Sequence, residues 1–140
     1  MFYIVITISI ILWIWFLGCT ITWRIGKVLL VEGMGVKSAE FVFLIFFTLG
    51  ILLFACYPQI GCWVLLRELA FWLTVQFLCH WRYTIFGVTQ NKLKGYNECF
   101  EGTVRLFPMS GTRLIPDLYH IVLHILIAID LICVFIQITL

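Results

Sequence analysis

Charged side chains are scarce in this chain. Its 140 residues include 9 Lys and Arg and 7 Asp and Glu, whereas 64% of the residues are hydrophobic. About a quarter of the residues in a typical soluble domain are charged, and a disordered chain combines low hydrophobicity with high net charge. Both classes are therefore excluded, and the formal net charge of +2 is too small to indicate nucleic-acid binding. The composition predicts an integral membrane protein in contact with the lipid bilayer.

The chain also lacks the motifs of common catalytic and metal sites. It has no P-loop, nucleophile elbow or zinc motif, and none of its six cysteines forms a C-x-x-C pair. That spacing excludes a metal knuckle or a thiol-redox centre built from this chain alone. We expect the cysteines to be buried free thiols, which behave as small hydrophobic side chains.

The N-terminal apolar run lacks the parts of a cleavable signal peptide. It extends from Phe2 to Trp23 and ends at Arg24, without a basic start or a small-residue cleavage site. A helix of that length spans a hydrocarbon core of roughly 30 Å. We expect a first transmembrane helix over about 2–23 that is retained in the mature chain.

A second apolar run predicts a second transmembrane helix over about 41–66. Pro58 lies inside this run, and proline removes a backbone hydrogen bond from a helix. The run is therefore either one kinked helix or a shorter helix followed by a turn. Arg67 and Glu68 close the run and are expected to be its snorkelling end.

Basic residues predict the orientation of these two helices. Arg24, Lys27 and Lys37 lie in the link between them, whereas residues 1–23 carry no basic side chain. Because inner loops are enriched in Lys and Arg, the link is expected inside and the N-terminus outside. Residues 1–68 are thus predicted to form a transmembrane helical hairpin.

The apolar C-terminal stretch, residues 118–140, leaves two structures open. Its length predicts a transmembrane helix, but its many Ile and Val residues are typical of strands. Asp130 near mid-bilayer would also cost about 2.5–3.5 kcal/mol on insertion scales. The chain is therefore either a two-helix hairpin followed by a β-rich segment or a four-helix transmembrane bundle.

Three histidines and one acid are candidate functional groups. His120 and His124 share a face if their segment is helical, and with His80 they could hold a haem or another metal between helices. Asp130 and Gln137, seven residues apart, would align on one helical stripe, as in an ion or proton path. The residues alone thus allow a b-type haem anchor or a small transporter or assembly subunit.

Several short motifs follow one another along the chain from Glu40 onward. The motifs are Glu40-Phe41-Val42-Phe43, Tyr57-Pro58-Gln59-Ile60, Leu66-Arg67-Glu68, Leu73-Thr74-Val75 through His80-Trp81-Arg82-Tyr83, Arg105-Leu106-Phe107, Pro116 through His120-Ile121, and Asp130 through Phe135. Their order resembles the N-terminal part of cytochrome c oxidase subunit II, in a split or highly diverged form.

This resemblance implies a fold. Two spanning helices would be followed, over residues 69–140, by a partial cupredoxin-like β segment on the outer side. Cys133 stands where the family has a copper-ligand histidine, and the family's cysteine-containing ligand loop is absent. The dinuclear copper centre would therefore lie on a partner chain that completes the sheet, because a half-sheet exposes unpaired strand edges.

The resemblance also implies a function. The chain would anchor a haem–copper oxidase, complex IV of the respiratory chain, which couples electron transport to proton transport, and it would not be a complete enzyme. Glu40 would lie near the mouth of a proton-uptake path, and Trp81 or Tyr83 would pass electrons. This chain alone would bind no cofactor; haem a would belong to the complex, which includes a subunit I-like chain. The expected location is the mitochondrial inner membrane, with the N-terminus on the intermembrane-space side.

Overall fold

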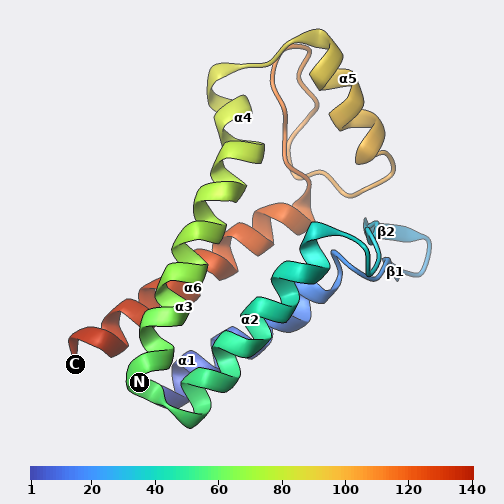
Figure 1. The fold of residues 1–140 in the computed structure, drawn as a ribbon. Helices are drawn as coiled ribbons and strands as arrows, with labels where there is room; N and C mark the ends of the chain where they lie inside the picture. The colour runs from blue at the N-terminus through green and yellow to red at the C-terminus, as the bar shows by residue number, and fades with distance from the viewer.

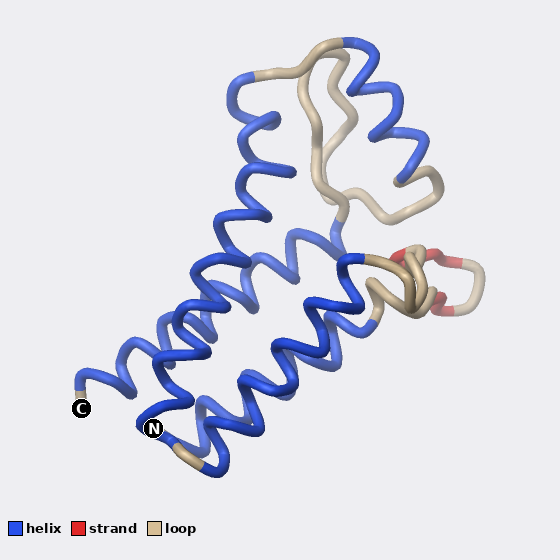
Figure 2. The backbone as a smooth tube through the Cα atoms, viewed as in Figure 1, coloured by secondary structure: helices blue, strands red, loops and turns tan.

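Helices account for most of the chain. The computed structural model covers residues 1–140, and Figures 1 and 2 show long helices lying side by side, with a short hairpin and a small helix at one end. The elements are, in chain order, α1 Phe2–Leu17, β1 Trp23–Ile25, β2 Val28–Val31, α2 Ala39–Cys56, α3 Pro58–Gln76, η1 Phe77–Trp81, α4 Arg82–Phe86, α5 Gln90–Cys99 and α6 Leu118–Thr139. Helix α3 continues through the π-helical turn η1 into α4.

Three of the helices are long and apolar enough to cross a membrane. They are α2, the continuous helix Pro58–Phe86, and α6, whereas α1 is apolar but shorter. Large apolar side chains point outward from these helices, among them Phe46 and Leu49 on α2 and Ile132 and Phe135 on α6. This arrangement is consistent with an integral membrane protein whose outer surface contacts lipid.

Polar side chains and proline define where the helices begin. The Ser38 side chain accepts a hydrogen bond from the Phe41 N–H and caps α2, and the Asp117 carboxylate caps α6 in the same way. Pro58 occupies the first turn of α3, where its missing N–H has no helical partner to lose. The second apolar run is therefore a helix, a turn at Tyr57 and the start of another helix.

The core lies where α1, α2, α3 and α6 meet. Trp72 of α3 is its centre, with its ring centroid 4.3 Å from that of Phe16 and 5.5 Å from that of Phe47. Helices α2 and α3 approach closely near their shared turn. A Cβ atom on Gly61 would lie only 2.1 Å from the Cα of Phe54, so glycine is needed at this contact. In lipid, which is as apolar as the side chains, the hydrophobic effect does not drive helices together, and close packing of this kind stabilises their association instead.

The predicted β-rich segment over 69–140 is wrong. Those residues complete the α3–α4 helix and form α5, a loop and α6, and the single sheet of the molecule is the β1–β2 hairpin near the N-terminus. Residues 118–140 are almost wholly helical because a helix satisfies its backbone hydrogen bonds without a neighbouring strand. The cost of Asp130 is reduced by a hydrogen bond from Ser9. The helical alternative is thus closer to the structure.

The predicted first helix is too long. Helix α1 ends at Leu17, and Trp23 already belongs to β1. A Cβ atom on Gly18 would lie 2.9 Å from the Tyr119 hydroxyl oxygen and 3.0 Å from a Val31 methyl carbon. The chain turns at this glycine because α6 and the hairpin pack directly against its backbone.

The two ends of the bundle differ. The N-terminus, the α2–α3 turn and the C-terminus lie at one end, here called the terminal end (Figure 1). The β1–β2 hairpin, α5 and the loop before α6 lie at the other, here called the capped end. A bridge between Leu29 and Thr103 joins the hairpin to that loop. Residues 87–117 therefore lie at the same end as the 24–40 link, and not across the membrane from it as expected.

Candidate functional site

The three histidines meet at the capped end. His80 lies on η1, and its ring centroid is 4.8 Å from that of His120 and 5.3 Å from that of His124 on α6. All three residues are more than nine-tenths buried. Short π-helical segments occur frequently at functional sites. Here the π turn carries His80 at the point where the continuous helix passes the start of α6.

Hydrogen bonds fix the state of His124. The Trp81 indole N–H donates to Nδ1 of His124 at 2.8 Å, and Nε2 of His124 lies 3.1 Å from Oε1 of Gln76. Because an indole nitrogen only donates, Nδ1 must accept and Nε2 must carry the proton. Neither nitrogen of His124 is free for a metal.

The other two histidines keep one nitrogen free of protein partners. Nδ1 of His80 is 2.9 Å from the Tyr96 hydroxyl, and Nδ1 of His120 is 2.6 Å from Asp117. No group of three or more His, Cys, Asp or Glu side chains is arranged to hold a metal ion. A site in which all three histidines hold one metal ion is therefore not formed. A haem held by His80 together with His120, whose Nε2 atoms have no protein partner, stays a prediction.

Asp117 controls the tautomer of His120. Its carboxylate is fully buried and accepts from both the backbone N–H and the ring of His120. Burial opposes ionisation, but the hydrogen bonds and charge of His120 outweigh it and hold the pKa of Asp117 below its ordinary value. Since a carboxylate only accepts, Nδ1 of His120 carries the proton. In the neutral ring Nε2 is then an acceptor.

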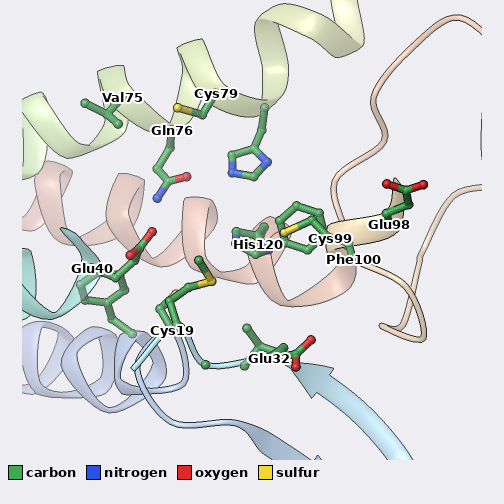
Figure 3. Close-up of a pocket in the computed structure, with 15 residues that line it drawn as sticks. Cys19, Glu32, Glu40, Val75, Gln76, Cys79, Glu98, Cys99, Phe100 and His120 are labelled. Carbon is green, nitrogen blue, oxygen red and sulfur yellow. The ribbon is translucent and has the colours of Figure 1, made fainter. Parts of the chain in front are cut away.

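A cavity of about 610 Å³ adjoins this cluster. Its polar lining includes Glu40, Gln76, His80 and His120, and its aromatic lining consists of Phe16 and Phe100. Figure 3 shows the side chains of Glu40 and Gln76 pointing toward each other, whereas the carboxylates of Glu32 and Glu98 point away. Glu40 is thus the one acid directed into this cavity.

Further polar groups lie deeper in the bundle, between α1 and α6. The Ser9 hydroxyl on α1 donates to the Asp130 carboxyl group on α6, at 3.0 and 2.9 Å from its two oxygens. Neither residue has any exposed surface. A polar pair is therefore sealed inside the membrane-spanning part of the molecule.

Helix α3 carries a second carboxyl group at a similar depth. Gln76 contacts His124 at the capped end, and Glu68 and Asp130 lie eight and six residues further into the bundle, or about 12 and about 9 Å at helical rise. Oε2 of Glu68 is buried beside Gly50 of α2 and has no hydrogen-bond partner. The prediction that Glu68 ends a helix is wrong, because α3 continues past it.

Polar side chains of α3 and α6 also lie at the terminal end of the bundle. Gln137 of α6 and Gln59 of α3 line a second cavity, of about 460 Å³, beside Pro58. Oε1 of Gln137 is buried and has no hydrogen-bond partner. Antiparallel α3 and α6 therefore carry facing polar groups near both of their ends and a carboxyl group each in between.

The residues singled out by the oxidase resemblance are dispersed. Glu40 lines the cavity and Trp81 bonds His124, but the Tyr83 ring lies on α4 beneath the Lys92 ammonium, 3.7 Å from it. Cys133 is half-buried on α6. The structure does not bring these four residues together, and their proposed roles stay predictions.

The thiol prediction is partly correct. All six cysteines are free, but Cys19 and Cys62 alone are buried, and Cys133 is half-buried. Cys56, Cys79 and Cys99 are exposed on the surface of the chain. Ser9, Gln76, Tyr96 and Asp117 were not among the functional residues predicted from the sequence. An N-cap pattern before the last apolar run could have indicated Asp117, whereas the other three depend on contacts between distant segments.

Comparisons with known proteins identify no relative. No family model matches the chain, and no curated protein or solved structure matches it. The functional conclusions therefore depend on the side chains described above: a histidine cluster and cavity at the capped end, and buried polar groups along α3 and α6.

Proposed function

We propose that this protein is a transport component of the membrane that moves protons or a small cation between its two ends. The observation that carries the proposal is the series of polar groups along antiparallel α3 and α6. The series begins at Gln76 and His124, passes Glu68 and Asp130, and ends at Gln59 and Gln137. Ionisable residues inside spanning helices are costly and generally mark a substrate or proton route.

A purely structural role accounts for only part of this series. The Ser9–Asp130 hydrogen bond joins α1 to α6 and would serve as a contact between helices in any membrane protein. Buried oxygens of Glu68 and Gln137, by contrast, have no hydrogen-bond partner. An unpartnered buried polar atom lowers stability, which favours a role other than holding helices together.

Apolar side chains separate the polar levels. Leu69 on α3 and Ile127 and Val134 on α6 have no exposed surface. No open water-filled pore is therefore expected in this conformation. The spacing favours stepwise transfer, in which Glu68 and Asp130 take up and release a proton or bind a cation while the helices move against each other.

The oxidase function stays a sequence-based prediction. It depended on a β segment at residues 69–140, and these residues form helices and a loop. Purification of the native protein with whatever co-elutes would test it directly. An a-type haem spectrum, copper and a chain with the missing ligand loop would support the oxidase, whereas a colourless protein without these partners would contradict it.

The transport proposal is tested in proteoliposomes that contain the purified full chain and an internal pH-sensitive dye. A proton gradient and a membrane potential are imposed, and internal acidification is followed. Asp130→Asn is expected to lower the rate by roughly tenfold or more, since it removes an ionisable group from the route. Glu101→Gln removes an exposed carboxylate at the capped end and is the matched control. Equal rates for Asp130→Asn and the unmodified protein would overturn the proposal.

A further inference from the structure

The cavity at the capped end has the size and lining of a small-molecule site. Its volume of about 610 Å³ is within the roughly 300–1,000 Å³ typical of ligand pockets. Its lining residues come from the ends of α2, α3 and α6 at the capped end, and from β2 and α5. Its polar lining comes from several helical segments, so its ligand preference follows from how these groups are arranged.

Glu40 and Gln76 form a charged and a neutral pole on opposite walls. Oε1 of Gln76 accepts from His124, so the amide N–H groups of Gln76 are directed elsewhere. Figure 3 shows the Gln76 side chain directed toward the Glu40 carboxylate. No hydrogen bond joins these two side chains. The space between them suits a cation that also carries an oxygen atom.

His120 adds an acceptor to the same cavity. Its Nδ1–H is bonded to Asp117, and its Nε2 has no partner in the chain although only 10% of the side chain is exposed. An N–H group of a ligand would satisfy it. When the His120 ring is neutral, the cavity has two acceptors, the Glu40 carboxylate and Nε2 of His120, which call for a ligand with more than one N–H donor.

Aromatic rings complete the lining. Phe100 packs on Tyr96 with ring centroids 4.5 Å apart and meets the His120 ring edge-on at 5.1 Å. Phe16 lines the cavity as well. The faces of such rings attract cations, most strongly where water is excluded.

We propose that this cavity binds a small organic cation with a primary ammonium group and a neighbouring hydroxyl or ester oxygen, as in a 2-aminoethanol unit. The ammonium N–H groups bond to Glu40 and His120, and the oxygen accepts from the Gln76 amide. The unit is either a free amino alcohol or the headgroup of an aminolipid from the adjacent bilayer leaflet. This goes beyond the proposed transport, because binding at the cavity requires no movement across the membrane.

The test is calorimetric titration of the full chain in nanodiscs made of phosphatidylcholine, which has no primary amine. Three probes are compared: ethanolamine, choline and 1-propanol. Ethanolamine is expected to bind, choline to bind several-fold more weakly because it lacks N–H donors, and 1-propanol not to bind because it lacks charge. Equal affinity for all three probes would overturn the proposal. So would the absence of ethanolamine binding, if phosphatidylethanolamine is also not enriched on the unmodified protein relative to Glu40→Gln.

Matched variants assign the binding to Glu40. Glu40→Gln is expected to weaken ethanolamine binding by about tenfold or more, the effect of losing a charge-assisted hydrogen bond. Glu40→Asp keeps the charge and should recover part of the loss. Glu98→Gln removes an exposed acid that also borders the cavity and should change the affinity by less than about twofold. A Glu98→Gln loss as large as that of Glu40→Gln would exclude the proposed contact.

A second nanodisc composition distinguishes the two sources of the amine. If the natural ligand is an aminolipid, phosphatidylethanolamine in the disc will compete with free ethanolamine, and that lipid will be enriched on the unmodified protein relative to Glu40→Gln. If the ligand is a free amino alcohol, the ethanolamine affinity will be the same in both discs. The measurement is independent of proton flux, so the binding and the transport proposals can fail separately.

Discussion

Ser9 and Asp130 are 121 residues apart in sequence, and the Ser9 hydroxyl donates to both oxygens of the Asp130 carboxyl group, at 3.0 and 2.9 Å. Both side chains are fully buried. The contact joins the first helix to the last, and it places an ionisable group inside the bundle with one neutral partner. Substitutions of this pair and of Glu68, which has an unpartnered buried oxygen, should therefore distinguish effects on stability from effects on transport.

The Ser9–Asp130 hydrogen bond should be measurable as a coupling energy. A double-mutant cycle of Ser9→Ala and Asp130→Ala, followed by denaturant unfolding in detergent, is expected to give about 0.6–1.7 kcal/mol, the range found for hydrogen bonds between membrane helices. Thr7→Ala on the same helix removes an exposed hydroxyl that bonds its own helix. Coupling of Thr7→Ala to Asp130→Ala should be near zero, and an equal value would show that the cycle does not report the contact.

Substitution of Glu68 should raise stability and lower transport. Glu68→Met removes a buried oxygen without a partner and is expected to raise the free energy of unfolding by about 1 kcal/mol. The same substitution removes an ionisable group from the proposed route, so proton flux in proteoliposomes should fall. A stable variant with undiminished flux would leave Glu68 outside the route.

Stability should depend on pH through Asp117. Its pKa lies below the ordinary value of 3.8, through hydrogen bonds from His120 that outweigh its burial. A carboxyl group with a lowered pKa in the folded state contributes stability that is complete above 3.8 and is lost as the pH falls through the folded value. Unfolding of Asp117→Asn should lack this decline. A parallel decline in both proteins below that pH would assign it to other groups.

A side chain at Gly61, in the first turn of α3, should destabilise the protein. A Cβ atom there would lie 2.1 Å from the Cα of Phe54, so Gly61→Ala must separate the two helices and is expected to cost roughly 1–3 kcal/mol. Gly95 lies in α5, and a Cβ atom on it would have no neighbour within 4 Å. Gly95→Ala is therefore expected to stabilise the protein by about 0.5–1 kcal/mol, and thermal unfolding in detergent would compare the two variants.

The two ends of the bundle should react from opposite sides of the membrane. Cys99 at the capped end is exposed, and Leu140 at the terminal end is 86% exposed. Two single-cysteine variants are compared, one that keeps only Cys99 and one that carries only Leu140→Cys. An impermeant maleimide added to intact cells should label the Leu140→Cys variant and leave Cys99 unlabelled until the cells are opened. This orientation follows from the excess of Lys and Arg at the capped end. The reverse pattern would invert the topology.

The sequence alone determined the class of protein and the approximate position of the apolar segments. Its low charge and long apolar runs require lipid surroundings, whatever the contacts between helices. It also placed His120 and His124 on one face, since that relation follows from helical spacing alone. Local properties of this kind need no knowledge of the rest of the chain.

Tertiary structure decided the points on which composition was ambiguous. Ile and Val in residues 118–140 suit a strand or a membrane helix equally, and the partner that Ser9 provides for Asp130 favours the helix. The end of α1 depends on Tyr119 and Val31, which pack on Gly18 from distant parts of the chain.

The functional groups were hidden for the same reason. Glu68 resembled a helix end because an apolar run stops there, but the helix begins at Pro58 and continues past it. The approach of His80 to His120 depends on the π turn and on the path of α3 across α6. Spacing along one helix is fixed by its own geometry, whereas a site made from several helices exists only after they have packed.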